Sequence, residues 1–204
     1  IFPMMMLASN HESRKAARKL FRRATTDADT GLPNRIAFEE AATNIMQMNG
    51  PETSLAYLDF DHFSLVNDTV SHAAGDVLIN AISSLLQANL NQGEKLFRIG
   101  GDEFVLLLPD MDMEQDIREV AMKVSKEVQT PLQIDDTELA VTFSMGIAMY
   151  PDDGEDTETL FSHADRAMFF AKAQGRNQAC FFRDMTIKGI DKQELYIQNR
   201  LASA

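Results

Sequence analysis

The sequence predicts an α+β fold, an α/β sandwich in which helices cover a central and mostly antiparallel sheet. The first observation is the apolar run Ser54–Phe60, which is typical of a buried strand. The second is a pair of short apolar runs, 96–99 and 104–108, which flank two glycines and two acids and so predict a hairpin. The third is that segments with helical spacing alternate with these runs. The 204 residues suffice for one such domain with flanking segments.

Each expected element follows from hydrophobic spacing and from its stop signals. Apolar residues three and four positions apart predict helices at 10–24, 34–48, 74–90, 112–129 and 157–174. Apolar or alternating runs predict strands at 54–60, 96–99, 104–108, 132–134, 139–150 and 179–182. Gly50-Pro51 ends the second helix and Gly175 ends the last, while Asp135-Asp136 fits a turn between two strands. Residues 61–71 are expected to form a loop and a short helix.

The chain is expected to have three regions: a connecting helix or stalk at 1–25, a domain at 26–183, and a linker with a helix at 184–204. Residues 1–7 are apolar, and six Lys and Arg residues follow between positions 14 and 23. Basic residues cluster on the cytoplasmic side of membrane helices. One interpretation is therefore a cytoplasmic domain of an inner-membrane-anchored protein. The other is a solvated basic helix after an incidental apolar extension.

Composition excludes several function classes. The net charge of −12 argues against non-specific nucleic-acid binding, which depends on Lys and Arg contacts to phosphates. Cys180 is the only cysteine, so an intrachain disulfide and a cysteine-based zinc site are excluded, and a reducing cytosol fits.

The segment Gly100-Gly101-Asp102-Glu103 is the strongest candidate for a functional site. Two adjacent carboxylates at a hairpin tip repel each other, so we expect a cation there, most simply a divalent metal that carries phosphates. The alternative is an exposed acidic turn. Asp59 ends a buried strand, where an unpaired acid is costly. If that strand lies beside the hairpin, Asp59 and Asp102 converge on an oxygen-rich site suited to Mg²⁺ or Mn²⁺.

Further polar residues allow both a ligand-binding and a structural interpretation. Asn67 and Asp76 match the donors and acceptors of a guanine edge, but they also suit a helix cap and a first-turn acid. His72 is interpreted as a ligand contact or, preferably, as a hydrogen-bonded structural histidine. Asp61 is interpreted as a helix cap.

Lys172 and Arg176 are spaced four residues apart near the end of a helix and should share one face. They could clamp a triphosphate, or they could complement the helix C-terminus.

Together these motifs resemble the GGDEF-domain diguanylate cyclases over residues 25–183. The matching segments are Asp27–Arg35, Asp59–Phe63, Asn67–Thr69, His72–Asp76, Gly100–Phe104, Ala164–Met168 with Lys172, and Gly175–Asn177. The resemblance implies a palm-like nucleotidyl-cyclase fold. It implies that two GTP condense into cyclic di-GMP with release of two pyrophosphates, across a homodimer of half-sites that needs Mg²⁺ or Mn²⁺. It further implies fusion to sensory or phosphodiesterase (EAL) domains.

The resemblance also implies residue roles. Asp59, the Phe60 carbonyl, Asp102 and Glu103 would hold metal, and Asp102 and Glu103 would be catalytic, with Glu103 holding a second ion or assisting deprotonation of the attacking hydroxyl. The substrate-binding residues would be Phe63, Asn67, His72, Asp76, Gly100, Gly101, Lys172 and Arg176.

Departures from the family pattern bear on activity. Ser64 stands where the family has a lysine, which removes a possible phosphate contact. Ser71 replaces a glycine and Asp29 a leucine. The family's inhibitory product site, Arg-x-x-Asp, reads Asn91-Gln92-Gly93-Glu94, so we expect weak or absent product feedback. Three functions remain open: an active cyclase, a GTP-binding domain that tunes an adjacent EAL domain, and a non-catalytic dimerisation module.

Overall fold

A computed structural model describes residues 2–47, 52–134 and 137–187 of the chain, with side chains from residue 14 onward. Its helices are α1 (Phe2–Thr25), α2 (Arg35–Gln47), α3 (Phe63–Thr69), α4 (His72–Ala88), α5 (Glu114–Val128), α6 (Thr157–Ala173) and α7 (Phe182–Ile187). Its strands are β1 (Thr53–Phe60), β2 (Lys95–Gly100), β3 (Glu103–Pro109), β4 (Leu132–Ile134), β5 (Thr137–Leu139), β6 (Phe143–Tyr150) and β7 (Ala179–Phe181).

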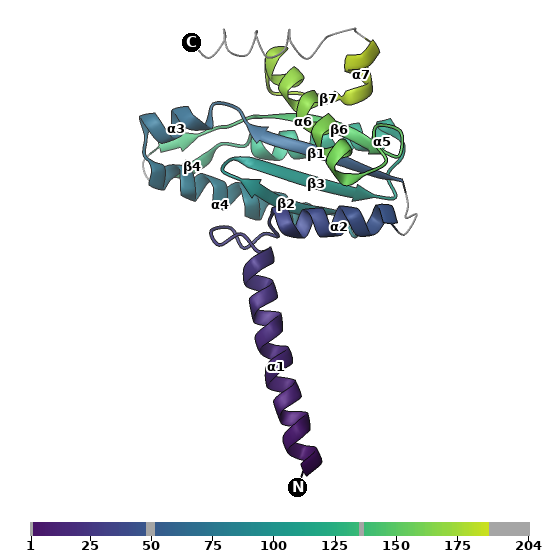
Figure 1. The fold of residues 1–204 in the computed structure, drawn as a ribbon. Helices are drawn as coiled ribbons and strands as arrows, with labels where there is room; N and C mark the ends of the chain where they lie inside the picture. Colours follow the sequence, from purple (N-terminus) through teal and green to yellow (C-terminus); the bar gives the residue numbers. More distant parts are fainter. Residues whose placement is uncertain (1, 48–51, 135–136, 188–204) are drawn as a thin grey trace.

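The main sheet has the strand order β2-β3-β1-β6-β7 (Figure 1). The central strand β1 pairs antiparallel with both β3 and β6, and only β7 joins in parallel, next to β6. β4 and β5 form a separate two-stranded ribbon. The predicted α+β fold with a mostly antiparallel sheet is confirmed.

Helices cover both faces of this sheet because β1 is apolar on both sides. Ala56, Leu58 and Phe60 belong to the core cluster that α4 and α5 cover. The alternate residues Leu55 and Tyr57 belong to the second cluster, under α2 and α6. Since side chains alternate along a strand, Asp59 lies on the α2/α6 face.

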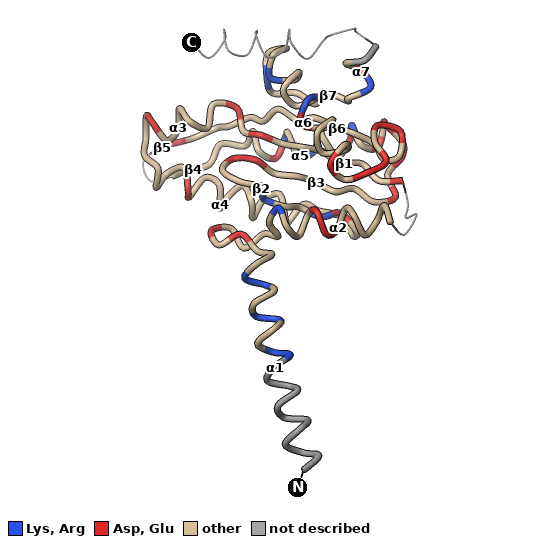
Figure 2. Tube along the Cα trace, viewed as in Figure 1, with Lys and Arg blue, Asp and Glu red and all other residues tan. Residues whose placement is uncertain are grey.

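The helix α1 extends away from the domain (Figure 1). Asn34 connects it to α2: its amide nitrogen donates to the Ala24 carbonyl over 2.8 Å, and its side-chain oxygen accepts from the backbone N–H of Ala37. Leu20 and Phe21 on α1 are 67% and 56% exposed. Figure 2 shows Lys and Arg along the described part of α1, whereas Asp and Glu lie mainly on the domain. A basic helix thus lies where the stalk is predicted, and its role as a connecting stalk stays a prediction.

Two strand predictions needed correction. The run 139–150 is not one strand, because β5 ends at Leu139 and β6 begins at Phe143. The last strand ends at Phe181, and α7 begins directly after it. The predicted turn at 135–136 and residues 188–204 of the predicted C-terminal linker lie outside the described residues. Within the described residues, no helix has the length and hydropathy needed to cross a membrane.

Candidate active site

The end of β1 lies directly beside the tip of the β2–β3 hairpin. Asp59 is the register partner of Glu103, and the backbone N–H of Phe60 donates to the Asp102 carbonyl over 3.4 Å. Residues that face each other on antiparallel strands point to the same side of the sheet. Asp59 and Glu103, 44 positions apart in the sequence, therefore lie on one side of the sheet at this edge, and the Asp102 backbone lies next to them.

The two glycines of the hairpin have different structural roles. Gly101 has a φ of +45°, so it takes the left-handed conformation that a tight reversal needs. Gly100 lies in β2, outside the positive-φ residues, so the reversal does not require a glycine there. A Cβ on either residue would meet no atom within 4 Å. The space above both is open for a ligand.

Asp59 is the most perturbed carboxylate of this edge. Its side chain is 13% exposed, and its Oδ1 lies 2.5 Å from Lys172 Nζ on α6. This contact is an ion pair, and among the described residues the buried Oδ1 has no other polar partner. Burial raises the pKa of Asp59 to about 6 against the opposing effect of Lys172, and the charges of Asp102 and Glu103 raise it further.

The donor set at this edge suits a hard cation but does not form a complete metal centre. Among the described residues, no three His, Cys, Asp or Glu side chains converge closely enough to hold a metal ion. Asp59, Asp102 and Glu103 nonetheless offer only oxygen ligands, and the unsatisfied Asp59 Oδ1 already has one positive charge beside it. These residues fit a divalent cation that arrives with a ligand.

A second part of the site lies where α3 meets α4. A Cβ on Gly75 would lie 2.1 Å from Asn67 Oδ1 and 3.1 Å from Phe63 Cζ. Asn67 and Phe63 are four residues apart on α3 and so both face the first turn of α4. Asp76 follows Gly75 and is exposed. The residues predicted to recognise a base are thus brought together.

Gly75→Ala is expected to displace the Asn67 side chain and to weaken GTP binding about tenfold, the effect of one lost hydrogen bond. The fold should persist, because the atom nearest to the added Cβ is the end of the Asn67 side chain. Calorimetric titration with a non-hydrolysable GTP analogue measures this. Asn67→Ala and the double variant serve as controls: if the two changes were additive, the effect of Gly75→Ala would not act through Asn67.

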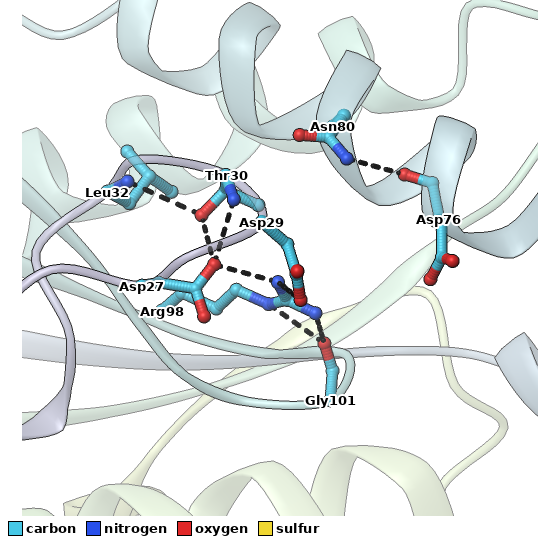
Figure 3. Close-up of polar contacts among 8 residues, drawn as sticks. All are labelled: Asp27, Asp29, Thr30, Leu32, Asp76, Asn80, Arg98 and Gly101. Carbon is cyan, nitrogen blue, oxygen red and sulfur yellow. Dashed lines mark hydrogen bonds and ion pairs between the residues drawn. The ribbon is translucent and has the colours of Figure 1, made fainter.

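Arg98 had no predicted role, but it organises the hairpin (Figure 3). Its guanidinium donates twice to the Gly101 carbonyl, over 3.1 and 2.9 Å, and once to Asp27 Oδ1 over 2.8 Å. A weaker contact of 3.4 Å reaches Asp29. Arg98 is only 9% exposed. The hairpin and the loop after α1 are therefore connected through one buried cation.

Asp27 is itself fixed by the loop. It accepts from the backbone N–H and the hydroxyl of Thr30, over 2.9 and 2.6 Å. Burial alone would raise the pKa of Asp27, but these bonds and Arg98 together lower it below the usual value. Asp27 is therefore a matched partner for the buried guanidinium. The signal in the sequence was the pairing of an acid-rich turn with a lone arginine in an apolar strand.

Arg98→Met is expected to lower the free energy of unfolding by about 2 kcal/mol, because Asp27 and the Gly101 carbonyl lose their buried donor. Urea unfolding measures the change. Arg35→Met is the matched control, since its ion pair with Glu39 is more than half exposed and should contribute less than about 0.5 kcal/mol. Equal losses in the two variants would contradict the role of Arg98.

Other predicted residues have different positions from those expected. Asp61 does not cap a helix: it is 5% exposed and accepts from Thr142 Oγ1, Ser144 Oγ and the backbone N–H of Asn177. His72 is exposed in the first turn of α4, and its role as a ligand contact or as a hydrogen-bonded structural histidine stays a prediction.

Lys172 and Arg176 do not share a helix face. The helix α6 ends at Ala173, and Gly175 and Arg176 have φ values of +116° and +64°. The backbone N–H groups of Arg176 and Gly175 donate to the Ala171 and Lys172 carbonyls, the pattern of a Schellman ending. This left-handed exit moves Arg176 off the helix, so the spacing rule did not apply.

The remaining departures are local. Ser71 is the N-cap of α4 and accepts from the backbone N–H of Ala74 over 3.1 Å. Ser64 is exposed on α3. Asn91 donates through its backbone and side chain to the Glu94 carboxylate, over 2.7 and 2.8 Å. The two residues thus form hydrogen bonds with each other within one turn. The expected absence of product feedback at this turn stays a prediction.

Comparison with known proteins places these features in a family. The model for "Diguanylate cyclase, GGDEF domain" matches residues 24–178. MucR of Pseudomonas aeruginosa, a bifunctional diguanylate cyclase/cyclic di-GMP phosphodiesterase, is 36% identical over 171 residues, or 82% of this chain and 25% of MucR. PdeR of Escherichia coli, a cyclic di-GMP phosphodiesterase, is 35% identical over 84% of this chain and 26% of PdeR. The chain thus spans about a quarter of these relatives.

Solved structures agree with the fold. The coiled coil and GGDEF domain of DgcB from Caulobacter crescentus, in complex with c-di-GMP, matches with a TM-score of 0.77 and 28% identity over 86% of this chain and 95% of that one. The GGDEF domain of YfiN (TpbB) from P. aeruginosa has a TM-score of 0.72 and 29% identity, over 74% and 97% of the two chains. The chain therefore belongs to the GGDEF-domain diguanylate cyclase family.

Proposed function

We propose that this domain condenses two GTP molecules into cyclic di-GMP and two pyrophosphates, with Mg²⁺ or Mn²⁺ as cofactor. The observation that supports this most directly is the register of β1 and β3, which sets Asp59 opposite Glu103 beneath the open Gly100-Gly101 tip. The proximity of Asn67 to Gly75, and the exposed Asp76 next to Gly75, support a base-recognition role for Asn67 and Asp76.

In this proposal one group of residues binds GTP and another holds the cofactor. Asn67 and Asp76 hydrogen-bond the guanine edge, and Phe63 lines the base site with His72 at the adjoining helix start. Lys172 and Arg176 contact the terminal phosphates, which requires Lys172 to leave Asp59 as the nucleotide arrives. The open Gly100-Gly101 backbone allows the phosphates a close approach.

The carboxylates supply the ligands for the cofactor. Asp59, Asp102, Glu103 and the Phe60 carbonyl would hold it. A divalent cation supplies neutralisation of the triphosphate charge and acidification of the 3′-hydroxyl. Glu103 is the residue that assists removal of the hydroxyl proton. Asp102 acts as a ligand for the cofactor at the tip of the β2–β3 hairpin.

One domain holds only one GTP, so the reaction needs two domains facing each other. Pairing of half-sites supplies proximity that a single domain lacks. The exposed Leu20 and Phe21 on α1 are suited to pair stalks of two copies. The specific rate should therefore rise with protein concentration.

A second candidate function is a GTP-binding domain with little turnover that regulates a fused EAL domain. The observation in its favour is the Asp59–Lys172 ion pair, which places a cation on the proposed metal ligand when no nucleotide is bound. Ser64, which stands where the family has a lysine, also favours low turnover because it removes a possible phosphate contact. Relatives named as phosphodiesterases, such as PdeR, agree with it.

One assay separates these functions. The protein is incubated at high concentration with GTP and Mg²⁺ or Mn²⁺, and the nucleotides are separated by chromatography. Cyclic di-GMP that is absent with Glu103→Gln supports the cyclase. Saturable GTP binding without product supports the regulatory domain. Absence of GTP binding would overturn both and leave a dimerisation module.

A further inference from the structure

Tyr57 is a buried polar residue on β1 with no role so far. It is 4% exposed and lies in the apolar cluster under α2 and α6. Its ring packs edge-on against Phe161 of α6, with ring centroids 5.0 Å apart and an interplanar angle of 72°. This contact fixes the ring, so the direction of the hydroxyl is also restricted.

The strand register places Tyr57 and Glu103 on the same face of the sheet. Tyr57 faces Val105 and Asp59 faces Glu103, so Tyr57 and Glu103 are diagonal neighbours on one face of the sheet. A diagonal neighbour is within reach of an aromatic side chain. The Glu103 carboxylate is thus the acceptor that the register brings nearest to the Tyr57 ring on this face.

A tyrosine hydroxyl keeps its proton at neutral pH. A protonated hydroxyl among carboxylates can act only as a donor to them. Glu103 is half-buried at the start of β3, two residues after Gly101, so a fixed donor restricts its position.

We propose that Tyr57 is a positioning residue, whose buried hydroxyl donates to the Glu103 carboxylate and holds it beside Asp59. This inference rests on the proposed function, in which Glu103 assists proton removal and metal binding. Tyr57 itself does not contact the substrate. It orients a carboxylate that would otherwise turn toward solvent and away from the like charge of Asp59.

Tyr57→Phe tests the proposal, because it removes the hydroxyl and keeps the ring packed on Phe161. A hydrogen bond to a charged group supports a loss of kcat of about tenfold or more. The KM for GTP should stay within about twofold and the Tm should be nearly unchanged, since base and phosphate contacts are elsewhere. Tyr150→Phe, in the neighbouring strand β6, is the matched control and should retain the wild-type kcat.

Two readouts do not depend on turnover. Crystal structures of both variants should show Glu103 in place in Tyr150→Phe but displaced or spread over several conformers in Tyr57→Phe. Calorimetry with Mn²⁺ and a non-hydrolysable GTP analogue should show weaker Mn²⁺ binding only in Tyr57→Phe. An unmoved Glu103 with wild-type Mn²⁺ affinity overturns the role of Tyr57. A wild-type protein without cyclic di-GMP overturns the proposed function instead, and these two readouts then decide on Tyr57.

Discussion

Gly146→Ala is expected to destabilise the domain more than any other single methyl group added to it. A Cβ at this position would lie 1.9 Å from the Ala164 carbonyl oxygen and 2.1 Å from the Met168 backbone nitrogen. These atoms belong to the backbone of α6 and cannot turn aside as a side chain can. The helix would have to move off β6, and we expect a loss of about 4 kcal/mol or more in the free energy of unfolding.

Urea unfolding followed by circular dichroism measures this loss. Gly100→Ala is the matched control, because a Cβ there meets no atom within 4 Å. Its free energy of unfolding should stay within about 1 kcal/mol of wild type. If Gly146→Ala were as stable as this control, the close packing of α6 on β6 would be wrong.

Asp59→Asn is expected to have opposite effects on activity and stability. Turnover should fall about 1,000-fold, because the amide is a poor ligand for the cofactor that neutralises the triphosphate. Stability at pH 8 should rise, because the wild-type protein buries a carboxylate whose pKa is raised to about 6. Lys172 is 19% exposed and can turn toward solvent when its partner is lost.

The pH dependence follows from the direction of the Asp59 shift. The folded state holds this proton more tightly than the unfolded chain, where the pKa is 3.8. The contribution of Asp59 to stability is therefore complete below pH 4 and is lost as pH rises through 6. The shift corresponds to at most about 3 kcal/mol.

Unfolding between pH 4 and 8 in the presence of EDTA measures this contribution. The stability gain of Asp59→Asn over wild type should be small at pH 4 and reach about 1–3 kcal/mol at pH 8. Asp68→Asn, an exposed acid on α3, is the control and should show little gain at either pH. A gain that does not change with pH would contradict burial as its cause.

The sequence predicted most of the fold because the strands are short apolar runs separated by clear turn signals. It also predicted that Asp59 and Asp102 converge, since a hairpin tip and a strand end meet when the strands pair. It failed at 139–150, where alternation continues through residues 140–142 although the backbone leaves the sheet. It failed at Arg176 because the left-handed exit at Gly175 interrupts the helical spacing.

The parts of the site that sequence reasoning missed are long-range contacts. Arg98 and Asp27 are 71 residues apart, and no local pattern links a strand arginine to a distant turn. In the sequence, Tyr57 is indistinguishable from the other apolar residues of the strand 54–60. Its relation to Glu103 depends on which residues face each other across β1 and β3, which requires the register.

Gly146 in β6 also determines where the Lys172 ammonium lies. The helix α6 rests with its backbone at Ala164 and Met168 against Gly146, and Lys172 is one turn further along. Sliding the helix by a single residue would shift the ammonium by about 1.5 Å and rotate it by about 100°. The absence of a side chain at Gly146 thus fixes the position of α6 along β6. This position brings Lys172 into contact with Asp59.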